Sequence, residues 1–469
     1  MITSDALAVL ALTSIALFVF GLKRLSRVRT ARSGNALLAG GMLLAVIITL
    51  LEVGRVDYRW IVGGLVLGGA IGWAIVARAQ ATQMPEIVAR FNGFGGAASA
   101  LVAMSLFWAN VVEPGRDVVA ADVLGVTPAI TLVLSVVIGT VTLSGSIFAE
   151  LKLRSRVPDG RIPARAVVML GLLAVAIGVG VYGLFGTADI ALAELAVIGV
   201  LAASLLVGVV LVLPIGGADM PVVISLLNSL SGLAAAATGF ALSNHLLIIA
   251  GTIVGAAGLI LTQIMCVAMN RSLLNVLVGG FGGGGASDHG DYGTVVSADA
   301  ESAAMVLEVA ESVIIVPGYG LAAARAQNAA HNVAKALIDR GVNVRFAIHP
   351  VAGRMPGHMN VVLAEAEVPY ELLVEMSEIN QDFANTDAVI VVGANDVVNP
   401  AARTEPSSPI AGMPILDVEQ ARRVFVIKRS LSPGYAGIKN ELFERDHTVM
   451  LFGDAKAVLD DLAAQLSSS

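Results

Sequence analysis

The sequence predicts an all-α membrane bundle of about nine helices followed by a soluble α/β domain with a doubly wound parallel sheet. Three observations support this: an uneven distribution of charge, apolar stretches long enough to span a bilayer, and alternating strand and helix patterns near the C-terminus. Of the 469 residues, 56% are hydrophobic and 14% charged, with a mean hydropathy of +0.82. An ordinary soluble domain has about 25% charged residues, so a purely soluble protein is excluded.

The two parts of the chain differ in charge. Residues 1–270 carry 15 basic and 12 acidic side chains, a net of +3, whereas residues 271–469 carry a net of −10. We therefore expect a transmembrane domain over 1–270, a linker over 271–298 and a soluble domain over 299–469. The centre of that linker is too glycine-rich for a helix and too polar to be buried. The single cysteine, Cys266, excludes a disulfide framework, and we expect no metal site.

Nine apolar stretches are long enough to cross a membrane, which takes about 20 residues in a helix. They lie at about 5–22, 36–54, 60–78, 86–112, 121–148, 164–186, 190–214, 220–243 and 245–268. The first does not resemble a signal peptide, because no basic residue precedes it. Glycines and alanines in the stretches predict close helix packing, which small residues permit in lipid. Those singled out are Gly63, Gly64, Gly68, Gly69, residues 93–96 and residues 234–237.

The basic residues predict the orientation in the membrane. Twelve lie in the loops after the first, third and fifth stretches, and three lie in the alternate loops. Lysine and arginine near membrane helices resist translocation. We therefore expect the N-terminus outside and the soluble domain in the cytoplasm.

Polar residues within the stretches are informative because they are costly in lipid. Asn92 and Asn228 lie inside the fourth and eighth stretches, and Asp219 stands at the start of the eighth. For each asparagine the alternative to a functional role is a hydrogen bond between helices. The spacing of Glu86 and Arg90 allows an ion pair within one helix. No histidine lies in the interior of a stretch, and His245 falls in the short turn where the ninth begins. A proton route would therefore use asparagine, serine, carboxylates and water, or a titrating group of a partner.

The C-terminal part alternates between strand and helix patterns, as in a doubly wound sheet. Expected strands are 312–317, 343–348, 387–392, 423–428 and 448–452, with helices near 300–311, 320–339, 370–383 and 455–466. The first strand runs into the sequence G-x-G-x-x-A at 318–323. Glycines at such a strand-to-helix turn let a pyrophosphate approach the backbone. The second strand ends at His349 with no acidic residue for a ribose hydroxyl, which disfavours NAD and leaves NADP open.

Further loops at strand ends carry polar residues, where such sheets bind ligands. Arg354 is placed to pair with a phosphate, and residues 393–396 follow the third strand. The turn at 428–430 offers two cations and a hydroxyl for a 2′-phosphate, the alternative being a solvated basic turn. The glycines at 434 and 437 give backbone freedom to a lid over the nucleotide, and the alternative for Tyr435 is simple packing.

Over essentially its whole length, the chain resembles the β subunit of the proton-translocating nicotinamide nucleotide transhydrogenases. The resemblance is strongest at 218–223, 227–229, 269–272, 317–320, 349–360, 393–396, 428–430 and 434–437. It implies hydride transfer between NAD(H), on a partner α subunit, and NADP(H), on this chain, coupled to proton translocation. The implied NADP site consists of Gly318, Tyr319, Gly320, Val351, Ala352, Gly353, Arg354, Met355, Pro356, Gly393, Ala394, Asn395, Asp396, Val397, Gly412, Met413, Lys428, Arg429, Ser430, Leu431, Ser432, Pro433, Gly434, Tyr435, Asp454 and Ala455.

The resemblance also implies catalytic roles. Asp396 is expected near the nicotinamide, and Asn228 and Asp219 on the proton path. Asn92 stands where many members carry a titrating histidine, so either that group lies on a separate membrane-spanning α subunit or the chain is uncoupled. We expect the first, because the rest of the path is intact. The family further implies a dimer of αβ units. The expected location is a bacterial inner membrane. The chain is expected to contact the lipid bilayer and to bind no nucleic acid. The alternative function is a membrane transporter or channel regulated by an NADP-sensing domain.

Overall fold

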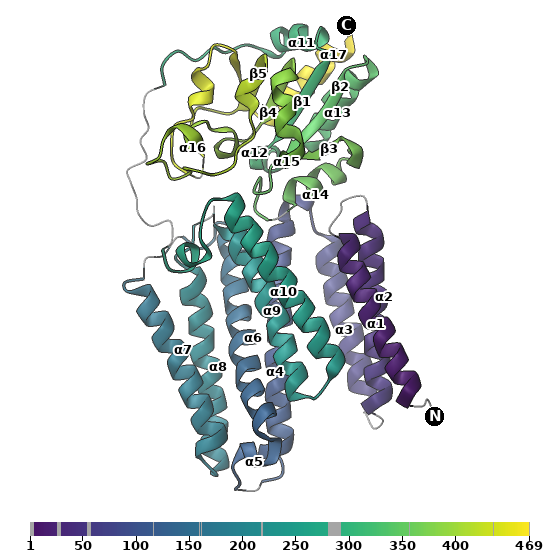
Figure 1. Ribbon diagram of the computed structural model, residues 1–469, viewed down its shortest axis with the longest axis vertical. Coiled ribbons are helices and arrows are strands. Elements are labelled where there is room, and N and C mark those ends of the chain that lie inside the picture. The colour runs from purple at the N-terminus through teal and green to yellow at the C-terminus, as the bar shows by residue number, and fades with distance from the viewer. Residues whose placement is uncertain are drawn as a thin grey trace.

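The computed structural model describes residues 4–25, 30–53, 58–115, 117–158, 160, 162–216, 219–279, 292–355, 357–434 and 436–468. Within these residues, a helical bundle carries an α/β domain at one end (Figure 1). The N-terminus lies at the other end of the bundle (Figure 1). The middle of the expected linker, 280–291, and the expected site residues Pro356 and Tyr435 lie outside the described residues.

Nine of the described helices are long and apolar enough to cross a membrane, which confirms the predicted number. They are α1 (Ser4–Leu25), α2 (Ala31–Val53), α3 (Tyr58–Ala77), α4 (Met84–Phe107), α6 (Val126–Leu153), α7 (Arg165–Val181), α8 (Ile190–Val212), α9 (Met220–Ala241) and α10 (His245–Ala268). The fifth span begins later than predicted. Gly125 has a φ of +88° and separates α6 from the short helix α5 (Ala120–Leu124).

Helices α4, α6, α9 and α10 touch through their backbones. A Cβ added to Gly96 of α4 would lie 2.5 Å from the carbonyl oxygen of Gly139 in α6. One added to Gly232 of α9 would lie 2.5 Å from the amide nitrogen of Gly255 in α10. The predicted close packing is therefore confirmed at these crossings. At the α3 glycines, no described atom of this chain lies within 4 Å of an added Cβ, so there the close packing stays a prediction.

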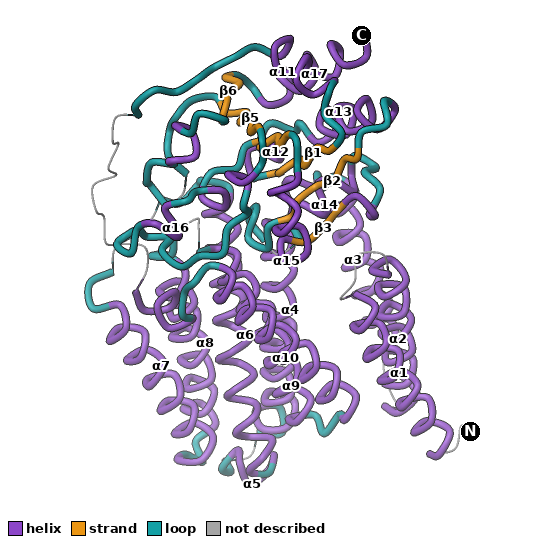
Figure 2. The backbone as a smooth tube through the Cα atoms, turned by 45° about the horizontal axis from the view of Figure 1, so that its top comes forward, coloured by secondary structure: helices purple, strands orange, loops and turns teal. Residues whose placement is uncertain are grey.

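The α/β domain contains one parallel sheet of six described strands in the order β3-β2-β1-β4-β5-β6. The strands are β1 (Ser312–Pro317), β2 (Asn343–Ile348), β3 (Leu373–Glu375), β4 (Ala388–Val392), β5 (Arg423–Lys428) and β6 (Thr448–Phe452). Helices α11 (Ala300–Glu308), α13 (Gln327–Asp339) and α17 (Ala455–Ser468) gather on one side of the sheet (Figure 2). This order places the topological switch point between β1 and β4.

Three local expectations for this domain are corrected. The segment 370–383, expected as one helix, contains the edge strand β3, the short helix α15 (Met376–Ile379) and 3₁₀ turns. The expected helix 320–339 is divided into α12 (Tyr319–Ala323) and α13 by Arg325, whose φ is +51°. Helix α14 (His358–Glu365) was not expected. The five expected strands are confirmed within one residue at their ends.

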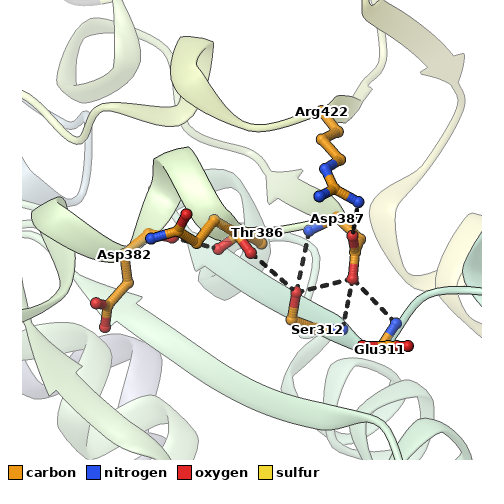
Figure 3. Close-up of polar contacts among 7 residues, drawn as sticks. Glu311, Ser312, Asp382, Thr386, Asp387 and Arg422 are labelled. Carbon is orange, nitrogen blue, oxygen red and sulfur yellow. Dashed lines mark hydrogen bonds and ion pairs between the residues drawn. The ribbon is translucent and has the colours of Figure 1, made fainter.

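A polar network holds the amino-terminal edge of the sheet, opposite the switch-point loops (Figure 3). One carboxylate oxygen of Asp387 accepts hydrogen bonds of 3.0 Å from the amides of Glu311 and Ser312 and from the Ser312 hydroxyl. Arg422 donates to the other oxygen at 2.8 Å. Burial acts to raise the pKa of Asp387, but these hydrogen bonds and the Arg422 charge outweigh it and lower the pKa. The network fixes β4 beside β1 at this edge.

Both described ends of the expected linker pack against folded structure. The Tyr292 ring stacks on Phe443, and the Met450 amide donates to the Val296 carbonyl at 2.8 Å. On the membrane side, Val276 is fully buried in the apolar cluster of the bundle. Residues on either side of 280–291 therefore belong to one folded part or the other.

Candidate nucleotide-binding site

A cavity of about 600 Å³ opens at the carboxyl edge of the sheet, where β1, β4 and β5 end. In open α/β sheets, the crevice at the topological switch point is where ligands bind. The loops after β1, β2, β4 and β5 form most of the wall. Met269 and Arg271, which follow α10, complete it. The membrane bundle therefore contributes directly to the wall of the cavity.

Glycines bring the ends of β1 and β4 into contact beneath the cavity. The Gly320 amide donates to the Gly393 carbonyl at 2.9 Å, and Gly393 has a φ of +63°. A Cβ added to Gly320 would lie 2.6 Å from the Cα of Gly393, and one added to Gly318 would collide with Ala394. Here the absence of side chains permits two backbones to touch and leaves peptide groups facing the cavity. The glycine motif predicted an approach of pyrophosphate to the backbone, and the contact between the ends of β1 and β4 is a second role that the motif did not predict.

Lys428 and Asp396 are two of the charged groups of the cavity wall. The Lys428 Nζ donates to the Ser432 carbonyl at 2.7 Å and to the Asn395 side-chain oxygen at 3.5 Å. Burial lowers the pKa of Lys428 to about 8, and the Asp396 charge opposes that shift. Asp396 Oδ2 accepts a hydrogen bond of 3.1 Å from the Ala436 amide. Asp396 thus holds the loop after β5 against the β4 loop.

The other members of the basic turn lie at the outer rim. The hydroxyls of Ser430 and Ser432 share a hydrogen bond of 2.9 Å. Arg429 pairs with Asp454 at 2.8 Å, and both side chains are exposed. Two cations and two hydroxyls therefore stand within one turn of chain, with Lys428 at its inner end, and such a set can bind a phosphate group.

The structure brings most of the expected site residues together. Those lining the cavity are Gly318, Tyr319, Gly320, Val351, Ala352, Gly353, Gly393, Ala394, Asn395, Asp396, Val397, Met413, Lys428, Arg429, Ser430, Ser432, Pro433, Gly434 and Ala455. Among the other described candidates, Arg354, Met355, Gly412, Leu431 and Asp454 do not line it. Arg354 instead donates to the Leu153 carbonyl of α6 at 2.7 Å.

Sequence reasoning missed the residues of the wall that come from outside the strand ends. Met269 and Arg271 belong to a stretch that carried the family resemblance, but they were given no role. Pro409 and Ile410, from the loop before β5, also line the cavity. For these two the sequence held no signal, because their position depends on the folded path of a loop.

The structure also locates the candidate proton-path residues. Asn92 is buried, and its amide donates to the Ile224 carbonyl of α9 at 3.2 Å, so the expected interhelical hydrogen bond exists. Asn228 is half-buried, and no described group hydrogen-bonds its side chain. Asp219 is fully buried, with Oδ1 4.0 Å from Nε of Arg271. The cavity wall and the start of α9 are therefore joined by an ion pair.

The allowed pair between Glu86 and Arg90 does not form. Arg90 pairs with Glu150 of α6, and Glu86 lies 3.7 Å from Arg154. The charges connect α4 to α6 rather than one turn of α4 to the next, because the two helices are packed side by side. This corrects the expectation of an ion pair within α4.

Comparison with known proteins agrees with these observations. A family model described as "NAD(P) transhydrogenase beta subunit" matches residues 7–465. The chain is 46% identical over 455 residues to the NAD(P) transhydrogenase subunit beta of Rhodospirillum rubrum, covering 96% of this chain and 97% of that protein. The same protein from a named strain of that species matches to the same extent. A match over nearly the whole length shows that the chain belongs to the NAD(P) transhydrogenase beta subunit family.

Proposed function

We propose that the α/β domain binds NADP(H) and that the chain works with an α subunit that carries NAD(H). The reaction is hydride transfer between NADH and NADP⁺, coupled to proton translocation across the membrane. The observation that carries this proposal is the shared cavity wall. Arg271 lines the cavity and also pairs with buried Asp219 at the start of a membrane helix. Family membership gives the reaction class, and this contact supplies a route for coupling.

The residues present fit NADP(H). The cavity of about 600 Å³ lies within the range of small-molecule sites. The peptide groups around Gly318 and Gly320 suit a pyrophosphate, and Lys428 with Ser430 suits a 2′-phosphate. At the end of β2, where NAD-binding domains place an acidic residue, stands His349. It is buried, hydrogen-bonds the Pro414 carbonyl at 2.8 Å, and has a pKa lowered to about 4 by burial.

The side chains of this chain position and enclose the nucleotide, and the cofactor supplies the hydride chemistry when bound. Asp396, anchored to the Ala436 amide, holds the loop after β5 over the cavity. This hydrogen bond restricts the position of Ala436 beside the cavity and so helps to orient a nucleotide bound there. Lys428 neutralises phosphate charge at the inner end of the same loop. No side chain is required as a covalent catalyst.

Coupling to protons runs through Asp219 and Arg271. Burial raises the pKa of Asp219 to about 6, and the Arg271 charge acts in the opposite direction. The carboxyl group therefore titrates near physiological pH. Protonation removes the Asp219 charge that attracts Arg271 and so weakens this ion pair at the cavity wall. A proton that reaches the start of α9 thereby alters the nucleotide site.

The proton path and assembly are proposed as follows. Asn92 and Asn228 lie on the path within the bundle, and a membrane-spanning part of a split α subunit provides the titrating group that Asn92 lacks. The complex is a dimer of αβ units. The chain lies in a bacterial inner membrane with its N-terminus outside and its nucleotide domain cytoplasmic. We propose 1–270 as the membrane domain, 271–298 as a linker whose two described ends pack on the bundle and on the α/β domain, and 299–469 as the nucleotide domain.

The test is reconstitution of the chain with its α subunits in sealed vesicles. Reduction of an NAD analogue by NADPH is followed with and without an uncoupler. We expect the uncoupler to change the rate, since a charge moved through 100 mV is worth about 2.3 kcal/mol. A rate that ignores the uncoupler in tightly sealed vesicles would refute coupling. NADPH binding without any hydride transfer would favour the alternative, a nucleotide-sensing transporter or channel.

The affinity for NADP⁺ should depend on pH through Lys428. Because the pKa of Lys428 is lowered to about 8, the side chain is charged below that pH and loses its charge above it. Titration calorimetry between pH 6.5 and 9.5 should show binding that is constant at low pH and weakens about tenfold as pH passes 8. Lys428→Arg keeps its charge throughout and should abolish the dependence. A wild-type affinity that is flat over this range would show that Lys428 does not bind phosphate.

A further inference from the structure

A buried asparagine stands behind the wall of the cavity. Asn440 precedes the 3₁₀ turn Glu441–Glu444 and is fully buried, although asparagine is mostly exposed in folded proteins. Its Nδ2 donates to the Asn395 carbonyl at 3.1 Å and to the Asn395 side-chain oxygen at 3.2 Å. Asn395 lines the cavity, and Asn440 does not. Asn440 therefore supports a residue of the cavity wall from behind.

The remaining polar groups of Asn440 also have partners. Oδ1 accepts a hydrogen bond of 3.0 Å from the Leu442 amide. The backbone amide donates to the Tyr292 hydroxyl at 3.1 Å, and the backbone carbonyl accepts from the Phe443 amide at 3.2 Å. The position uses both the donor and the acceptor of one side-chain amide, whereas an ionised aspartate of the same shape only accepts. A fully partnered buried amide of this kind fixes the groups that it joins.

The bond to Asn395 decides which way the Asn395 amide points. Its Oδ1 accepts from Asn440 at 3.2 Å and from Nζ of Lys428 at 3.5 Å. With its oxygen held on that side, the Asn395 Nδ2 faces Asp396 and donates to Oδ1 at 3.4 Å. The other oxygen of Asp396 accepts from the Ala436 amide. This carboxylate is thus oriented from two sides, and Asn440 controls one of them.

Tyr292, at the start of the second described part of the linker, anchors Asn440. The Tyr292 ring stacks on that of buried Phe443, with 6.1 Å between the centroids and 23° between the planes. A few residues further on, the segment 296–298 pairs with Met450 of β6. These contacts hold the Tyr292 hydroxyl in place to receive the Asn440 amide.

We propose that Asn440 is a positioning residue of the nucleotide site, which sets the Asp396 carboxylate through Asn395. The proposal rests on the proposed function, since it assigns a supporting residue to that same NADP(H) site. Hydrogen bonds lead from the Tyr292 hydroxyl through Asn440 to the Asp396 carboxylate. A shift of the linker at Tyr292 therefore reaches the cavity wall.

The test uses the full chain with its α subunits and the variant Asn440→Asp. This variant keeps the acceptor for the Leu442 amide, but in its ionised form it has no donor for Asn395. Fluorescence titration should show the NADPH Kd raised at least fivefold, because buried acceptors left without a donor are costly. Hydride transfer at saturating NADPH should also fall at least fivefold. Asn328→Asp is the matched control, since Asn328 is exposed on α13 and gains the same charge, and it should match the wild type.

A double-mutant cycle separates positioning of the site from mere support of the fold. Asn395→Ala and Asn440→Ala are measured singly and together. If Asn440 acts through Asn395, the double variant should bind NADPH within twofold of Asn395→Ala, because the second substitution removes nothing further. A double variant whose loss of affinity equals the two single losses multiplied together would overturn the proposal. A wild-type Kd and turnover in Asn440→Asp would do so as well.

Tyr292→Phe decides the question if the Asn440 variants do not fold. It keeps the stacked ring and removes only the hydroxyl that accepts from the Asn440 amide. NADPH affinity should fall at least twofold, and Tyr58→Phe, at an exposed position of α3, should leave it unchanged. A wild-type NADPH Kd in Tyr292→Phe would then count against the proposal. Failure of the proposed function would look different, because the wild-type complex itself would not bind NADPH.

Discussion

Replacing Gly320 by alanine is expected to weaken NADPH binding at least tenfold. The new Cβ would lie 2.6 Å from the Cα of Gly393, and neither backbone has a flexible side chain that could yield. Relieving the clash separates the turn after β1 from the end of β4 and breaks the 2.9 Å hydrogen bond between them. Overpacking of this kind costs about 1–3 kcal/mol, and a loss of about 1.4 kcal/mol is tenfold in affinity. Fluorescence titration with NADPH measures the change.

Gly171→Ala is the control for this substitution. Gly171 lies in α7, and no described atom stands within 4 Å of the added methyl group. The change in chemistry is the same, so binding should stay at the wild-type value. Equal NADPH affinity for Gly320→Ala and Gly171→Ala would mean that the contact between the β1 and β4 ends does not shape the nucleotide site.

Replacing Asn228 by leucine is expected to reduce proton-coupled turnover at least tenfold and to leave NADPH affinity within twofold of wild type. Asn228 lies in α9 about two and a half turns beyond Asp219. Its amide is half-buried, and no described protein group hydrogen-bonds it, so it is available to water or to a partner subunit. Leucine has a similar size but neither donates nor accepts. A hydrogen-bonded route at this depth would therefore be interrupted.

The measurement is hydride transfer in sealed vesicles, together with proton uptake reported by a pH-sensitive dye. Asn110→Leu serves as the control, since Asn110 is exposed and bonds only within its own helix, to the Leu106 carbonyl at 2.8 Å. Turnover should be unaffected in that variant. Normal coupled turnover in Asn228→Leu would remove Asn228 from the proton path.

The parts of the fold that depend on local sequence were predictable. Nine apolar stretches predicted nine spans because the length of a membrane helix is set by the bilayer. Five strands were visible because buried parallel strands are continuous runs of apolar residues. Strand β3 has only three residues, at the edge of the sheet, and carries too short a pattern to stand out. The break at Gly125 lies within an apolar run, where hydropathy gives no sign of it.

The residues of the candidate site were likewise predictable only where local sequence identifies them. The glycine motif and the polar loops at strand ends were found because their chemistry is contiguous in sequence. The position of Arg271 in the cavity wall was not found, because it depends on the end of α10 lying against a domain that begins beyond residue 290. Arg354 was expected to meet phosphate because its charge alone suits that task. In the structure Arg354 also donates to a backbone carbonyl about 200 residues away, a contact that side-chain identity does not encode.

The glycine crossings in the bundle have a mechanical consequence. Helices that meet through side chains can slide, because rotamers repack as the axes shift. At Gly96 against Gly139 and at Gly232 against Gly255, peptide meets peptide, and no rotamers exist to absorb a displacement. We therefore expect α4 to move together with α6, and α9 together with α10, during turnover. The few polar side chains and their waters then control proton access to the bundle. A bundle of this kind resists proton leakage while the nucleotide domain moves above it.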